Sequence, residues 1–127
     1  MKVLETTILI VDDEEHLQEN LVAYLEDEGY IVDTASSGEA GIAQVNRRKF
    51  DIGIIDMRLP GMDGNAFILR AHRIQPSMKF LIHTGSMTYV LPQSLMDIGI
   101  RTEQVFQKPV IDMEAMIRAI RELVGEN

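Results

Sequence analysis

The chain has 127 residues, which is the size of one domain and leaves little room for a second. Asp and Glu total 20 against 12 Lys and Arg, and the net charge of −8 argues against a protein that binds nucleic acid through a broad basic face. There is no cysteine for a disulfide, and the N-terminus lacks a signal-peptide core. No run is long enough to span a membrane, so we expect a cytoplasmic protein.

Short apolar runs rich in β-branched residues favour strands, and they alternate with segments of helical periodicity. Several runs are apolar without strict alternation, which is typical of strands that are buried on both faces of a parallel sheet. The alternation predicts an α/β fold with helices on both faces of that sheet. The expected strands are residues 7–11, 31–35, 51–55, 79–83 and 105–107.

The segments between the first strands carry signals for the ends of helices. The first expected helix has Leu17, Leu21 and Leu25 on one face, and Gly29 ends it. Ser37 is expected to cap the second helix through its side-chain oxygen.

In the second half, Asp63 is expected to cap a helix that begins at Gly64 and stops before Pro76. The segment 87–99 is the least regular, and Pro92 is expected to be the first residue of a short helix there. The last helix has one apolar face, formed by Met113, Met116, Ile117, Ile120, Leu123 and Val124.

Ligands of open α/β sheets bind beyond the carboxyl ends of the strands, so the residues at these ends are the candidates for chemistry. Asp12 and Asp13 follow the first strand, and Asp56 follows the third. Thr84 follows the fourth strand, and Lys108 follows the fifth. Two carboxylates about 4 Å apart repel by about 4 kcal/mol at an effective dielectric constant of about 20. Such a cluster needs a cation, a shared proton or a buried ammonium group.

Oxygen ligands without histidine or cysteine indicate Mg²⁺. Lys108 adds a positive charge to this edge of the sheet, and Thr84 adds a hydroxyl donor. A divalent ion, an ammonium and a hydroxyl around one carboxylate form a site for a phosphoryl group. Asp56 is the natural nucleophile, and the expected product is an aspartyl phosphate.

Four motifs together resemble the signature of the bacterial response-regulator receiver domain, namely "ILIVDDEE", "DIGIIDMRLPGMDG", "HTG" and "QKP". They occur in the family's order and cover essentially the whole chain. The resemblance implies one CheY-like receiver domain over 1–127, with a flavodoxin-like (βα)5 fold and strand order 2-1-3-4-5. It also implies a cis peptide bond before Pro109.

The resemblance implies that a sensor histidine kinase or a histidine phosphotransfer protein phosphorylates Asp56. The phosphoryl group would then switch a partner-binding or output surface, without turnover of a separate substrate. Thr84 and Lys108 would contact the phosphoryl oxygens. The chain is expected to be a monomer or a weak homodimer that contacts neither nucleic acid nor membrane directly.

The resemblance also implies a metal site for Mg²⁺, for which Mn²⁺ could substitute. Asp13 would bind the ion directly, and Asp12 would bind it mainly through water. Asp56 and the backbone carbonyl of Arg58 would complete the protein ligands.

One position departs from the family. Three residues before Lys108, many receivers have a Tyr or Phe whose ring turns inward with the threonine upon phosphorylation, but this chain has Val105. Phe106 is expected to point to the opposite face of the sheet. The resemblance therefore does not extend to the ring movement that accompanies the threonine.

The candidate residues and the whole chain also have simpler interpretations. Asp12 or Asp13 could cap a helix, Thr84 could be a turn residue, and Lys108 could be an ordinary surface lysine. A receiver that binds partners without phosphorylation agrees with Val105, although the intact acids count against it. A phosphatase with an aspartyl nucleophile would use similar chemistry, but such enzymes carry a D-x-D strand end and a cap domain.

Overall fold

The five strands form one parallel sheet in the order β2-β1-β3-β4-β5, which confirms the predicted order. The structure, a computed structural model, describes residues 6–110 and 112–125. Each strand lies close to its predicted position, and the third and fourth extend one residue further, so that both Asp56 and Thr84 end a strand. The strands are β1 (Thr7–Val11), β2 (Ile31–Ala35), β3 (Ile52–Asp56), β4 (Lys79–Thr84) and β5 (Val105–Gln107).

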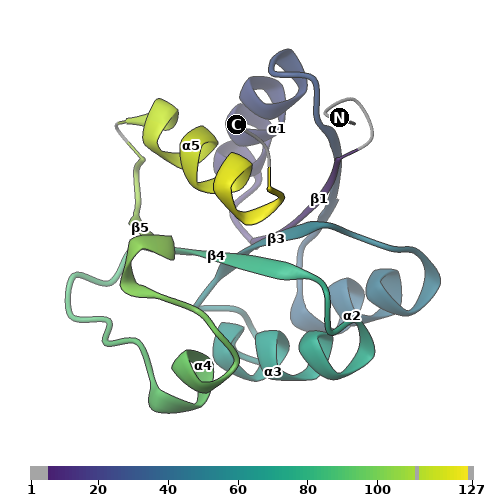
Figure 1. Cartoon of the computed structure of the whole chain (residues 1–127), viewed down its shortest axis with the longest axis vertical. Helices are drawn as coiled ribbons and strands as arrows, with labels where there is room; N and C mark the ends of the chain where they lie inside the picture. The colour runs from purple at the N-terminus through teal and green to yellow at the C-terminus, as the bar shows by residue number, and fades with distance from the viewer. Residues whose placement is uncertain (1–5, 111, 126–127) are drawn as a thin grey trace.

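Helices cover both faces of this sheet, as Figure 1 shows. Helices α1 and α5 lie on one face, and α2, α3 and α4 lie on the other (Figure 1). A short 3₁₀ turn, η2 (Thr102–Gln104), precedes β5. None of the helices in the described residues is long and apolar enough to cross a membrane. The helices are α1 (Glu15–Asp27), α2 (Gly38–Arg47), α3 (Gly64–Ile74), α4 (Gln93–Asp97) and α5 (Met113–Leu123).

The sheet separates two apolar clusters because successive side chains of a strand point to opposite faces. Leu9 and Ile55 belong to the cluster under α2, α3 and α4, whereas Ile8 and Ile54 belong to the cluster under α1 and α5. Strand β3 is buried at every position. Its continuous apolar run is therefore that of a central strand. The strand holds Asp56 at its carboxyl end, on the side of the sheet where the strands end.

The predicted helix caps are confirmed. Ser37 Oγ accepts a hydrogen bond from Ala40 N at 3.1 Å, and Asp63 Oδ1 accepts one from Ala66 N at 2.9 Å. Gly29, just beyond α1, has a φ of 97°, a conformation that favours glycine.

The segment before β5 holds one correction. Pro92 is the N-cap of α4 and not its first residue, and α4 is only 5 residues long. Val105 and Phe106 pack against the two opposite clusters, as predicted. The peptide bond between Lys108 and Pro109 is cis, as the resemblance implies.

Candidate functional site

The ends of β1 and β3 bring the predicted carboxylates together. Val11 pairs with Ile55 in the sheet, so Asp12 lies beside Asp56. Asp12 is 2% exposed and Asp56 is 4% exposed, whereas Asp13 is exposed to solvent. One carboxylate oxygen from each of the three residues lies within 4.8 Å of the others. The structure thus forms the acidic cluster that the sequence predicts.

Lys108 reaches this cluster from the loop after β5. Its Nζ lies 2.9 Å from Asp12 Oδ2, 3.3 Å from Asp56 Oδ2 and 2.8 Å from Glu14 Oε1. The lysine side chain is only 9% exposed, so it is not an ordinary surface lysine. Burial by itself lowers the pKa of Lys108, but hydrogen bonds to Glu14 and Asp12 and the nearby negative charges outweigh burial and raise the pKa to about 12. Lys108 is therefore a permanent cation in this site.

Backbone amides hold the two buried carboxylates in place. Glu14 N donates to Asp12 Oδ1 at 2.9 Å, and Arg58 N donates to Asp56 Oδ1 at 3.1 Å. Each carboxylate thus uses one oxygen for a backbone amide and directs the other to Lys108. The N-cap of α1 is Glu14, without a side-chain capping bond, so neither Asp12 nor Asp13 caps that helix.

Thr84 ends β4 and is fully buried. Its Oγ1 accepts a hydrogen bond from Ser86 N at 3.1 Å. Side chains alternate along β4, and Ile82 belongs to the cluster under α2, α3 and α4. The Thr84 side chain therefore points to the same face of the sheet as Ile82. Its contact with a phosphoryl group stays a prediction, as does the metal contact of the Arg58 carbonyl.

Glu14 is a further residue of the site, which was not among the candidates at the strand ends. Its hydrogen bond to Lys108, and then the charge of that lysine, lower the pKa of the Glu14 carboxyl. The position of Glu14, directly after the acid pair, is the signal that could have identified it.

His83 is a second residue that sequence reasoning missed. It pairs with Asp56 across β3 and β4 and is 5% exposed. Burial, and then the charge of Lys108, lower its pKa to about 4, so the imidazole is neutral at pH 7. Neither ring nitrogen has a hydrogen-bond partner among the described residues. One histidine in an apolar run gives no signal of this position.

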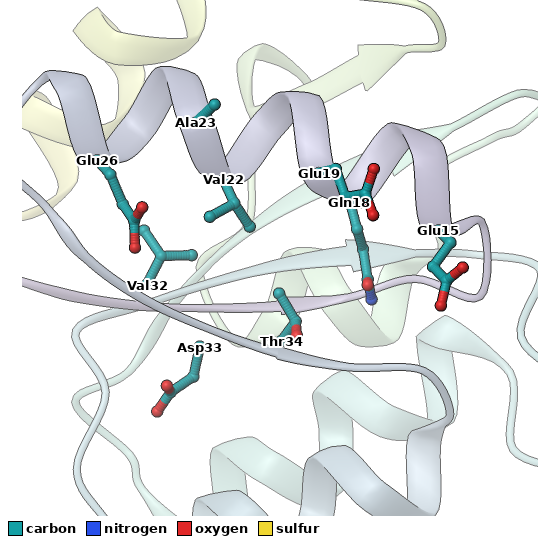
Figure 2. Close-up of a pocket in the computed structure, with 9 residues that line it drawn as sticks. All are labelled: Glu15, Gln18, Glu19, Val22, Ala23, Glu26, Val32, Asp33 and Thr34. Carbon is teal, nitrogen blue, oxygen red and sulfur yellow. The ribbon is translucent and has the colours of Figure 1, made fainter.

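A groove of about 490 Å³ lies between α1 and β2 (Figure 2). Its lining includes Glu15, Val22 and Val32 but none of the clustered aspartates. Gln18 reaches from α1 toward β2 in Figure 2, and its Nε2 donates to the carbonyls of Asp12 at 2.6 Å and of Ala35 at 3.0 Å. At its end near β1, the groove thus contains the residue that ties the Asp12 loop to the neighbouring strand.

The ligand atoms that the acidic cluster offers suit a hard divalent cation. All candidate ligand atoms are oxygens, and they come from three carboxylates on two neighbouring strand ends. Lys108 is ion-paired with Asp12, Glu14 and Asp56, and Asp13 adds a fourth carboxylate beside two of them. The excess of negative charge favours a further cation, and one exposed acid leaves the cluster open to solvent.

Comparisons with known proteins agree with this geometry. Residues 8–121 match the family described as response regulator receiver domain. The chain is 36% identical over 124 residues to the transcriptional regulatory protein GlrR of Escherichia coli K12, a match that covers 94% of this chain and 26% of GlrR. The chain therefore spans about a quarter of the length of that relative.

Solved structures show the same fold. A CheY-like response regulator receiver domain protein from Methanospirillum hungatei has a TM-score of 0.82 and 28% identity, with 95% of each chain covered. The response regulator TrrA of Thermotoga maritima, solved in complex with Mg²⁺ and BeF, has a TM-score of 0.80 and 24% identity, over 93% of this chain and 98% of TrrA.

Proposed function

Because this chain belongs to the response regulator receiver domain family, we propose that Asp56 is the residue on which it accepts a phosphoryl group. Receivers of this family act in two-component phosphorelays. The observation that carries the assignment is the position of Lys108, whose ammonium contacts both buried carboxylates, Asp12 and Asp56, beside the exposed Asp13. An acid that only stabilised the fold would not need two further acids next to it.

The proposed reaction is a transfer from a phosphohistidine of the partner protein to Asp56. A carboxylate oxygen of Asp56 attacks phosphorus, a P–O bond forms, and the P–N bond breaks. The other ring nitrogen of the phosphohistidine already carries a proton, so the electrons of the broken P–N bond return to the ring and it leaves as neutral imidazole. The product is a mixed anhydride that carries roughly two negative charges. Lys108 is held within 3.3 Å of Asp56 and can pair with the new charge without a large movement.

Asp12, Asp13, Asp56 and the carbonyl of Arg58 would hold Mg²⁺ or Mn²⁺ in this site. The bound ion would supply charge neutralisation at the phosphoryl oxygens. The clustered carboxylate oxygens support this set of ligands. The backbone amides that fix Asp12 and Asp56 keep both carboxylates oriented in the absence of an ion.

The proposed partner on the input side is a sensor histidine kinase or a histidine phosphotransfer protein, and the proposed location is the cytoplasm. On the output side, the relatives include transcriptional regulatory proteins that are much longer than this chain. We propose that phosphorylation of this receiver changes its contacts with an output domain or protein.

Mass spectrometry after incubation with acetyl phosphate and Mg²⁺ tests the assignment. The parent chain should gain the mass of one phosphoryl group, and Asp56→Asn should gain none. Asp27→Asn is the matched control, because Asp27 is an exposed carboxylate at the end of α1, and it should be labelled like the parent. Equal labelling of Asp56→Asn and the parent would place the acceptor elsewhere. No labelling of the parent would favour a receiver that binds partners without phosphorylation.

A further inference from the structure

Tyr89 is an aromatic residue close to the fourth strand end, and its hydroxyl can form a hydrogen bond that Val105 cannot form. It lies in the loop between β4 and α4, is half-buried, and packs against the same apolar cluster as Val105. Its hydroxyl donates a hydrogen bond to Asn65 Oδ1 at 2.9 Å. Asn65 lies in the first turn of α3, the helix that follows the loop after Asp56. Tyr89 therefore ties the loop after β4 to the segment after β3.

A continuous set of hydrogen bonds runs from Thr84 to Thr88, the residue directly before Tyr89. Ser86 N donates to Thr84 Oγ1 at 3.1 Å, and Ser86 O accepts from Gln107 Nε2 at 2.9 Å. The hydroxyls of Ser86 and Thr88 are 3.2 Å apart, and Thr88 N donates to Ser86 Oγ at 3.3 Å. Residues 84–88 thus form one hydrogen-bonded unit that ends directly before Tyr89.

Two apolar side chains of this loop contribute little to holding it in place. Its two large apolar side chains beside Tyr89 are mostly exposed, Met87 to 85% and Val90 to 80%. Such side chains contribute little burial, so the bonds at Ser86 and the half-buried side chain of Tyr89 carry more of the weight in positioning the loop. A segment positioned by these contacts can be displaced when one of them is lost.

We propose that Tyr89 is the positioning residue that couples Thr84 to this loop, and that its bond to Asn65 belongs to the unphosphorylated state only. The proposal rests on the proposed function of Asp56. When the Thr84 hydroxyl turns to donate to a phosphoryl oxygen, Ser86 N loses its acceptor unless the loop follows. Movement of residues 84–88 toward the site withdraws Tyr89 from Asn65.

This coupling has a measurable sign. A bond that exists only in the unphosphorylated state opposes phosphorylation, and its removal favours the phosphorylated state. Tyr89→Phe retains the ring and removes only the hydroxyl. We expect it to bind beryllofluoride, a mimic of the phosphoryl group, about 2- to 12-fold more tightly at saturating Mg²⁺, which is the range for one net hydrogen bond. Isothermal titration calorimetry on the whole chain measures this affinity.

Three further variants separate coupling from general damage. Asn65→Ala removes the same bond from the other side and should tighten binding to a similar extent, while the double variant should bind no more tightly than either single variant. Tyr24→Phe is the matched control, because Tyr24 is a half-buried tyrosine on α1, and its affinity should equal that of the parent. A merely structural role of Tyr89 would lower the melting temperature without changing the affinity.

The outcomes distinguish this inference from the proposed function. Unchanged or weaker beryllofluoride binding by Tyr89→Phe and Asn65→Ala, with normal binding by the parent, would overturn the coupling and leave the assignment of Asp56 intact. A parent chain that binds no beryllofluoride in the presence of Mg²⁺ and is not labelled by acetyl phosphate would overturn both.

Discussion

Lys108→Met removes the ammonium that is ion-paired with Asp12, Asp56 and Glu14 and leaves these carboxylates in place. Methionine fills a similar volume, so the change tests charge rather than packing. In the folded protein the pKa of Lys108 is about 12, against an ordinary value of 10.5. This difference corresponds to about 2 kcal/mol of stability, since one pKa unit equals about 1.4 kcal/mol.

The variant should lose more than this amount, because Asp12 and Asp56 remain buried without a counter-charge. Breaking a buried pair by removing one partner costs about 3–5 kcal/mol. We place the loss for Lys108→Met at about 3 kcal/mol, because the exposed Asp13 opens the cluster to solvent on one side. Urea denaturation at pH 7 without divalent ions measures this difference, and Lys79→Met, which changes an exposed lysine at the start of β4, is the control.

The dependence on pH and on Mg²⁺ gives this prediction two further tests. The raised pKa of Lys108 means that its contribution is complete below pH 10.5 and disappears as the pH rises through about 12. Mg²⁺ should stabilise Lys108→Met more than it stabilises the parent. A loss below about 1 kcal/mol, or a smaller effect of Mg²⁺ on the variant, would refute the assignment of Lys108 as the counter-charge.

Three further predictions concern other residues in and around the acidic cluster. Asp13→Asn should lose most of the increase in melting temperature that Mg²⁺ gives the parent, and equal increases in thermal scans would exclude Asp13 as a ligand. The pKa of His83 is lowered to about 4 in the folded protein, against an ordinary 6.5. Between these two pH values the unfolded chain binds more protons at His83 than the folded protein does, so the free energy of unfolding should fall by about 3 kcal/mol from pH 7 to pH 4. His83→Leu should lack this component in urea titrations, and an unchanged pH dependence would contradict it. Gln18→Ala should cost about 1 kcal/mol in the same assay, because the Asp12 carbonyl loses its side-chain donor while the Ala35 carbonyl keeps the amide of Asp12 as a donor. Gln93→Ala, on the exposed surface of α4, should cost less.

The arrangement of Asp12, Asp56 and Lys108 could be predicted because it follows from topology. Parallel strands with apolar cores must lie in the middle of a sheet, and their carboxyl ends must meet at one edge. The residue that follows each run is then near the others, whatever the detail of the loops. The same reasoning placed Val105 and Phe106 on opposite faces, since alternation along a strand needs no knowledge of partners.

The contacts that sequence reasoning missed depend on how loops close. Glu14 and Lys108 are 94 positions apart, and their bond requires the loops after β1 and β5 to approach each other above the sheet. No local periodicity encodes that approach. The bond between Tyr89 and Asn65 is of the same kind, because it joins an irregular loop to a helix 24 positions away. Pro92 was placed one residue too far into α4, which reflects the weak signal of a very short helix.

The position of Lys108 links the stability of this protein to its proposed chemistry. In the free protein its ammonium is divided between Asp12, Asp56 and Glu14, so none of these carboxylates has it alone. Phosphorylation would replace the carboxylate charge of Asp56 with a phosphoryl group that carries roughly two charges. Lys108 can then exchange one partner for a stronger one while Asp12 and Glu14 remain. The charge added at Asp56 therefore need not break the buried ion pairs of Lys108. The favourable interactions of the phosphoryl group can instead move groups that one hydrogen bond holds in place, and Thr84 is the first of these.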